Sequence, residues 1–131
     1  MIIKGKERIS ASEVAMLPGI DYLLYYGQFL DDFKRLDKED KGLLIEHAVK
    51  SLPDRPDYYD AFLAAVCETL AIENDLPVPK WTQGEDYYLD TPANPEGATR
   101  VPGFVDYLIE TTPELFYKRN VFFGDGIMRR C

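Results

Sequence analysis

The chain has 131 residues, of which 46% are apolar and 13% aromatic, and this composition excludes a disordered polypeptide and fits one domain with one hydrophobic core. Its net charge of −8 repels nucleic-acid phosphates and argues against nucleic acid as a partner. Two cysteines exclude a disulfide scaffold, and the longest apolar run falls far short of the roughly 20 residues that span a bilayer. The sequence therefore predicts a single cytoplasmic domain over residues 1–131, with no membrane association.

The N-terminal part of the chain predicts a short arm followed by two helices. Residues 1–9 form the arm, which has room for one strand. Ser10 and Glu13 stand three residues apart, which is the capping-box spacing, and predict a helix over residues 11–17. From Tyr22 to Leu36 the large apolar side chains recur at three- and four-residue steps. That period predicts a second helix with one buried face.

The middle of the chain predicts a shorter helix and then the central helix of the core. The shorter helix is expected over residues 40–51 and ends before Pro53. The clearest helical pattern runs from Asp57 to Asn74, with a continuous apolar stripe. Pro77 and Pro79 follow, and neither can donate a backbone hydrogen bond. We therefore expect the 57–74 helix to be the core helix and to end before these prolines.

Residues 82–103 form a long connector without helical periodicity. A connector of about 20 residues is uncommon inside a compact domain and is often functional. One interpretation is an ordered loop that holds Tyr87, Tyr88 and Leu89 on the core, and the other is a lid over a binding site. We favour the ordered loop over the lid.

The C-terminal part predicts two more short helices and an apolar tail. Phe104 to Ile109 has an amphipathic pattern, and Thr112 with Pro113 is typical of a helix start. Val121–Phe123 fits either a strand or a buried extended segment. Together these patterns predict an all-α, compact single domain of about five or six helices, with room for a minor two-stranded element at the ends.

No catalytic or metal-binding signature emerges from the reactive residues, and no cofactor is expected. His47 is the only histidine, no motif places a nucleophilic serine or cysteine beside it, and Cys67 falls on the core helix. Glu85, Asp86 and Asp90 form an acidic group in the connector that admits acid–base or metal chemistry. A solvated polar surface explains these carboxylates more simply.

Two stretches together resemble a group of small, poorly characterised bacterial proteins. Leu76–Trp81 resembles an LPVPxW element, and Thr112–Phe123 resembles a TPxxFRxRNIFV ending, with Tyr117 where those proteins usually have Arg. Some members of the group carry an N-terminal helix-turn-helix and lie beside nucleotidyltransferase-type toxins. No complete helix-turn-helix precedes residue 57 here. The resemblance therefore implies an antitoxin-like or regulatory protein-binding module, with a toxin as one partner, rather than a transcription factor.

The charge distribution suggests where a partner would bind. Residues 113–131 carry a net charge of +2 and the rest of the chain −10, so the basic end either docks on an acidic partner or packs on its own acidic body. The side chains that we predict to contact a protein partner are cations of this end and tyrosines of the connector: Lys118, Arg119, Arg129, Arg130, Tyr87 and Tyr88. Two alternatives stay open, a small metal-dependent hydrolase or transferase that uses the connector carboxylates, and a nucleic-acid binder that uses the basic end.

Overall fold

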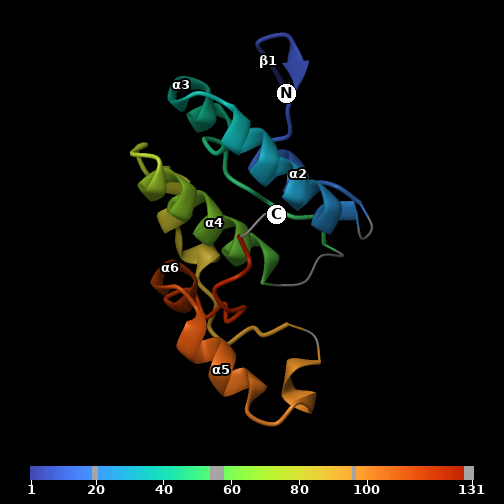
Figure 1. The fold of residues 1–131 in the computed structure, drawn as a ribbon, viewed down its shortest axis with the longest axis vertical. Coiled ribbons are helices and arrows are strands. Elements are labelled where there is room, and N and C mark those ends of the chain that lie inside the picture. The colour runs from blue at the N-terminus through green and yellow to red at the C-terminus, as the bar shows by residue number, and fades with distance from the viewer. Residues whose placement is uncertain (19–20, 54–57, 96, 129–131) are drawn as a thin grey trace.

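The fold is that of a computed structural model, which describes residues 1–18, 21–53, 58–95 and 97–128. Figure 1 shows an elongated arrangement, with a small hairpin at one end, α2 and α4 in the middle and α5 at the other end. The six α-helices of the described residues confirm the predicted all-α class. No helix among these residues is both long enough and apolar enough to cross a membrane.

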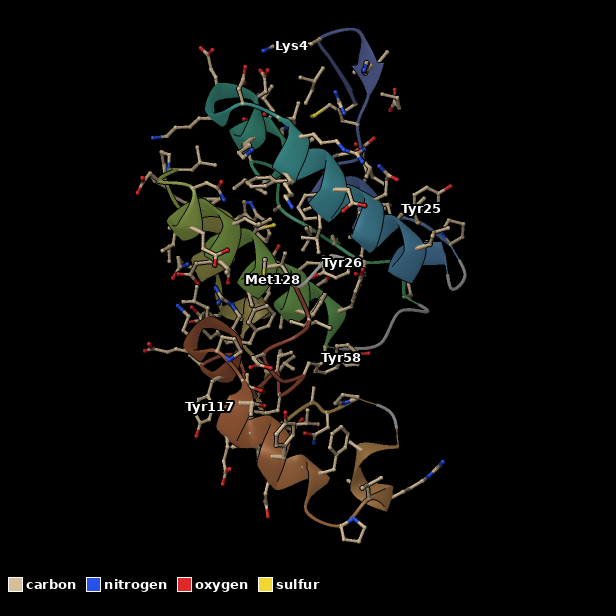
Figure 2. The ribbon with its side chains drawn as sticks, viewed as in Figure 1. Lys4, Tyr25, Tyr26, Tyr58, Tyr117 and Met128 are labelled. Atoms are coloured by element: carbon tan, nitrogen blue, oxygen red, sulfur yellow. The ribbon has the colours of Figure 1, made fainter. Side chains whose placement is uncertain are left out.

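The N-terminal arm is a hairpin of two very short strands. β1 (Ile2–Ile3) pairs with β2 (Lys6–Glu7) in antiparallel register, and the turn between them begins at Lys4. The Lys4 ammonium lies 2.5 Å from Asp37 Oδ2 and 3.1 Å from Asp40 Oδ2. Lys4 and Asp37 are exposed, whereas Asp40 is partly buried, so the first pair contributes little stability. Together the two pairs tie the tip of the hairpin, where Figure 2 labels Lys4, to the residues 37–40 that begin the next part of the fold.

Helix α1 (Ala11–Ala15) begins where the sequence predicts and ends two residues earlier. Its first turn has the predicted capping box, because the Glu13 backbone N–H donates to Ser10 Oγ and the Ser10 backbone N–H donates to the Glu13 carboxylate. Helix α2 (Asp21–Arg35) matches the expected second helix closely. Among its described residues, the buried apolar side chains follow the predicted spacing and are Tyr26, Phe29, Leu30 and Phe33. Asp32 is buried as well, and its carboxylate accepts from the Ile9 backbone N–H and the Gln28 side chain.

The prediction of a helix over residues 40–51 is wrong. The chain instead forms one turn of α-helix, α3 (Lys38–Lys41), and one 3₁₀ turn, η1 (Gly42–Leu44). Residues 45–51 then run without helical structure. This segment becomes one wall of the groove described below.

Two side chains from residues 81–87 explain why the helix stops. In a continuing helix the Ile45 carbonyl would accept from the backbone N–H four residues later. Here it accepts from the indole N–H of Trp81 at 2.9 Å, and the Val49 carbonyl accepts from the Tyr87 hydroxyl at 2.8 Å. Ile45 and Val49 are both buried, so tertiary contacts decide the backbone conformation here against the local pattern.

Helix α4 (Tyr59–Glu73) is the central helix, as predicted for residues 57–74. Almost all of its side chains between Tyr59 and Ala71 are buried, so the helix is enclosed on every side. Phe62 lies at its aromatic centre. The ring of Phe62 contacts the rings of Tyr26, Tyr59, Phe116 and Phe123, with centroids 5.1 to 6.0 Å apart.

The connector over residues 82–103 agrees with the favoured interpretation for two of its three large side chains, whereas Tyr88 lies over the Arg119 guanidinium. Tyr87 and Leu89 pack against the core, and the Leu89 backbone N–H donates to the Arg119 carbonyl. Three 3₁₀ turns lie in or at the start of the connector: η2 (Lys80–Gln83), η3 (Glu85–Tyr87) and η4 (Ala98–Arg100).

The C-terminal part contains helix α5 (Phe104–Thr111) and the single turn α6 (Glu114–Tyr117). Both were expected. Val121 is fully buried and forms a parallel bridge with Ala93, so the apolar tail is a buried extended segment that makes one bridge.

Beyond this bridge the chain returns toward the middle of the molecule. The Tyr26 hydroxyl donates to the Ile127 carbonyl at 3.1 Å, and Figure 2 places Tyr26 and Met128 between α2 and α4. The end of the chain therefore packs on its own body up to Met128.

Candidate functional site

Three of the predicted partner-binding residues meet just after α6, around a glutamate of α4. The Arg119 guanidinium is fully buried, and its Nη2 lies 2.8 Å from Glu68 Oε1. The Lys118 ammonium lies 3.0 Å from the same oxygen. Tyr88 covers the pair, with its ring centroid 4.8 Å from the Arg119 guanidinium carbon. We call Glu68, Lys118, Arg119 and Tyr88 the Glu68 cluster.

The Arg119 guanidinium also binds the backbone of two other segments. Nη2 donates to the Thr82 carbonyl at 2.8 Å, and Nη1 donates to the Leu115 carbonyl at 2.8 Å. One side chain therefore links α4, the connector and the C-terminal part. Hydrogen bonds to charged groups contribute about 1.5–3 kcal/mol each, so the cluster is a major tertiary link.

The protonation of Glu68 follows from its two cationic neighbours. Burial alone would raise the pKa of this carboxyl, but hydrogen bonds and charge interactions with Lys118 and Arg119 outweigh burial and lower the pKa below its ordinary value of 4.5. Glu68 is therefore ionised near neutral pH. One signal in the sequence points to Glu68: a carboxylate inside the apolar stripe of a core helix needs a buried partner.

The predicted contact residues differ in how much of their surface a partner could reach. Arg119 has no exposed surface, whereas the Lys118 side chain is 34% exposed. Tyr87 is half-buried, and its hydroxyl is bound to the Val49 carbonyl. Arg129 and Arg130 lie outside the described residues. The role of these residues in partner binding stays a prediction.

The reactive residues are either exposed on the surface or inaccessible. His47 is exposed, with Nε2 3.3 Å from Glu46 Oε1. Cys67 is fully buried, and burial raises the pKa of its thiol, so it stays an unreactive thiol. Glu85, Asp86 and Asp90 are exposed on the connector. Within the described part of the chain, no three His, Cys, Asp or Glu side chains gather as a metal-binding group.

A groove of about 550 Å³ lies between residues 39–48 and residues 76–81. We call it the 39–48/76–81 groove. One wall is the stretch that carries the LPVPxW resemblance, and the other is the segment that fails to form the expected helix. The groove is lined mainly by apolar side chains, which include Leu43, Ala48, Leu76, Pro77, Val78, Pro79 and Trp81.

The walls of this groove are held by specific contacts. The Trp81 indole joins the two walls through its hydrogen bond to Ile45, and its ring meets the Tyr87 ring edge-on at 5.1 Å. Pro77 and Pro79 restrict their own backbone and that of the preceding residues. The sequence did not predict this groove, because the groove exists only if residues 45–48 are not helical, and their apolar pattern predicted a helix.

Comparison with known protein families, with curated proteins and with solved structures found no significant match to this chain. The resemblance to the small bacterial proteins stays a prediction.

Proposed function

We propose that this chain is a non-enzymatic, cytoplasmic protein-interaction module, antitoxin-like or regulatory, and that the 39–48/76–81 groove is its docking surface. The observation that carries the proposal is a preformed apolar groove whose two walls are joined by the Trp81–Ile45 hydrogen bond. Leu43 on its edge is 37% exposed, which leaves apolar surface for a partner to cover.

Preorganisation is what makes such a groove suitable for binding. Ordering a flexible loop or side chain on binding costs about 0.5–1.5 kcal/mol per immobilised side chain. Here the prolines and the Trp81 and Tyr87 hydrogen bonds have already fixed the walls. Binding of a partner therefore does not have to order the walls of the groove.

The resemblance suggests which partners to test first, because similar proteins lie beside toxin genes. We expect the product of a gene adjacent to this one to co-purify with the wild-type chain. Leu43→Asp should abolish this co-purification, because it places a charge in the apolar groove. Where the partner is a toxin, co-expression of the wild type should also relieve its growth inhibition, and Leu43→Asp should not.

Val101→Asp is the matched control. Val101 is 55% exposed and lies beside α5, outside the groove, so this variant should retain the partner. The proposal is wrong if no neighbouring product binds, or if Leu43→Asp binds as tightly as Val101→Asp while both variants stay folded.

A further inference from the structure

The charges around the 39–48/76–81 groove are uneven. The wall formed by residues 39–48 carries the exposed carboxylates of Glu39 and Glu46, and the other wall carries the ammonium of Lys80. Glu39 makes no hydrogen bond or ion pair with any described residue, and Glu46 contacts only His47 among them. Two carboxylates therefore face solvent beside an apolar surface, on a chain with a net charge of −8.

From this arrangement we infer the chemistry of the occupant: a segment of a protein partner in which an apolar side chain is flanked by Lys or Arg. This inference rests on the proposed function and specifies what the groove recognises. The apolar side chain would pack against Leu43 and Trp81. The cations would lie along the wall of Glu39 and Glu46, and Lys80 restricts them to that side.

Electrostatics supports this occupant over an acidic or uncharged one. Complementary potentials speed the encounter of two proteins and suppress partners of the wrong charge. A cationic segment meets both a favourable long-range field from the acidic chain and two nearby carboxylates. An acidic segment would meet repulsion from the same two carboxylates, which Lys80 alone would not offset.

The single tryptophan provides a direct readout of groove occupancy. Trp81 lines the groove and is the only tryptophan of the chain, so its fluorescence reports binding there. A random nonamer peptide library displayed on phage would be selected on the full chain, and selected peptides would be synthesised and titrated. We expect selected sequences in which Lys or Arg flanks a large apolar residue, and we expect these peptides to change Trp81 fluorescence.

Charge-neutralising variants separate local contacts from net charge. Glu39→Gln combined with Glu46→Gln should weaken peptide binding by about fivefold, since two exposed ion pairs of modest strength are lost. Glu110→Gln combined with Glu114→Gln removes the same charge from exposed positions on α5 and α6, and should weaken binding much less.

Three results would overturn this inference: no selected peptide, selected peptides without cations, or equal losses in the two double variants. Groove-dependent co-purification of a neighbouring gene product would survive each of them, so the proposed function would stand without this occupant. Loss of that co-purification, with cationic peptides still bound in the groove, would instead remove the proposed function and keep the recognition chemistry.

Discussion

Glu68→Ala is expected to lower the free energy of unfolding by about 3–5 kcal/mol, because it leaves the Arg119 guanidinium buried without a counter-charge. Small domains have total stabilities of about 5–15 kcal/mol, so this loss is severe. Urea unfolding followed by Trp81 fluorescence measures it. Glu73→Ala removes an exposed carboxylate from the same helix and should change stability by no more than about 0.5 kcal/mol. Equal effects of the two variants would contradict a structural role for the Glu68 cluster.

The pH dependence of stability provides an independent signature of the same cluster. The folded-state pKa of Glu68 lies below its ordinary value of 4.5, so its ionised form contributes stability that is fully present above that value. This contribution is lost as the pH falls through the depressed folded-state pKa. The stability difference between wild type and Glu68→Gln should therefore be constant near neutral pH and shrink in acid. A difference that stays constant to the acid limit would contradict this assignment.

A double variant tests whether the charges or the packing matter. Replacing both partners with apolar residues, as in Glu68→Leu with Arg119→Met, should recover part of the stability that Glu68→Ala loses, as measured by urea unfolding. The recovery is expected because the buried charge disappears together with its partner. The recovery is incomplete because the Thr82 and Leu115 carbonyls lose their Arg119 donors.

Phe62→Ala is expected to have the second large effect, a loss of about 3–5 kcal/mol typical of a buried phenylalanine. Its ring contacts four other aromatic rings, from α2, α4, α6 and the C-terminal segment. Removing it leaves a cavity where these segments meet. Urea unfolding measures the loss, and Ile72→Ala serves as the control on an exposed position of α4. A loss for Phe62→Ala no larger than for Ile72→Ala would show that α4 is not the centre of the core.

The elements that local patterns specify were predictable from the sequence. The capping box of Ser10 and Glu13 placed α1, and the apolar spacing from Tyr22 to Leu36 placed α2. The unbroken apolar stripe identified α4 as the central helix. In each case the signal lies within a few turns of one helix, where side-chain spacing and backbone capping act together.

Features that depend on distant contacts were not predictable. Residues 45–51 have a helical apolar pattern. However, the Trp81 indole donates to the Ile45 carbonyl and the Tyr87 hydroxyl donates to the Val49 carbonyl. Arg119 was predicted to contact a protein partner, whereas the structure buries it completely. Its partner Glu68 lies on α4, and no local pattern in the sequence pairs the two residues.

The candidate site was only partly predictable for the same reason. The LPVPxW-like stretch was recognised from the sequence. The groove that it forms was not, because the opposite wall, residues 39–48, was expected to be largely helical. The connector was expected to hold Tyr87, Tyr88 and Leu89 on the core, and the structure confirms this for Tyr87 and Leu89.

Hydrogen exchange of the complex with the co-purifying neighbouring gene product tests the account most directly. If the groove is the docking surface, binding will slow amide exchange in residues 42–48 and in the non-proline residues of 76–81, and leave α5 unchanged. Protection confined to α5 and residues 98–100, with the groove amides exchanging as in the free chain, would contradict the account.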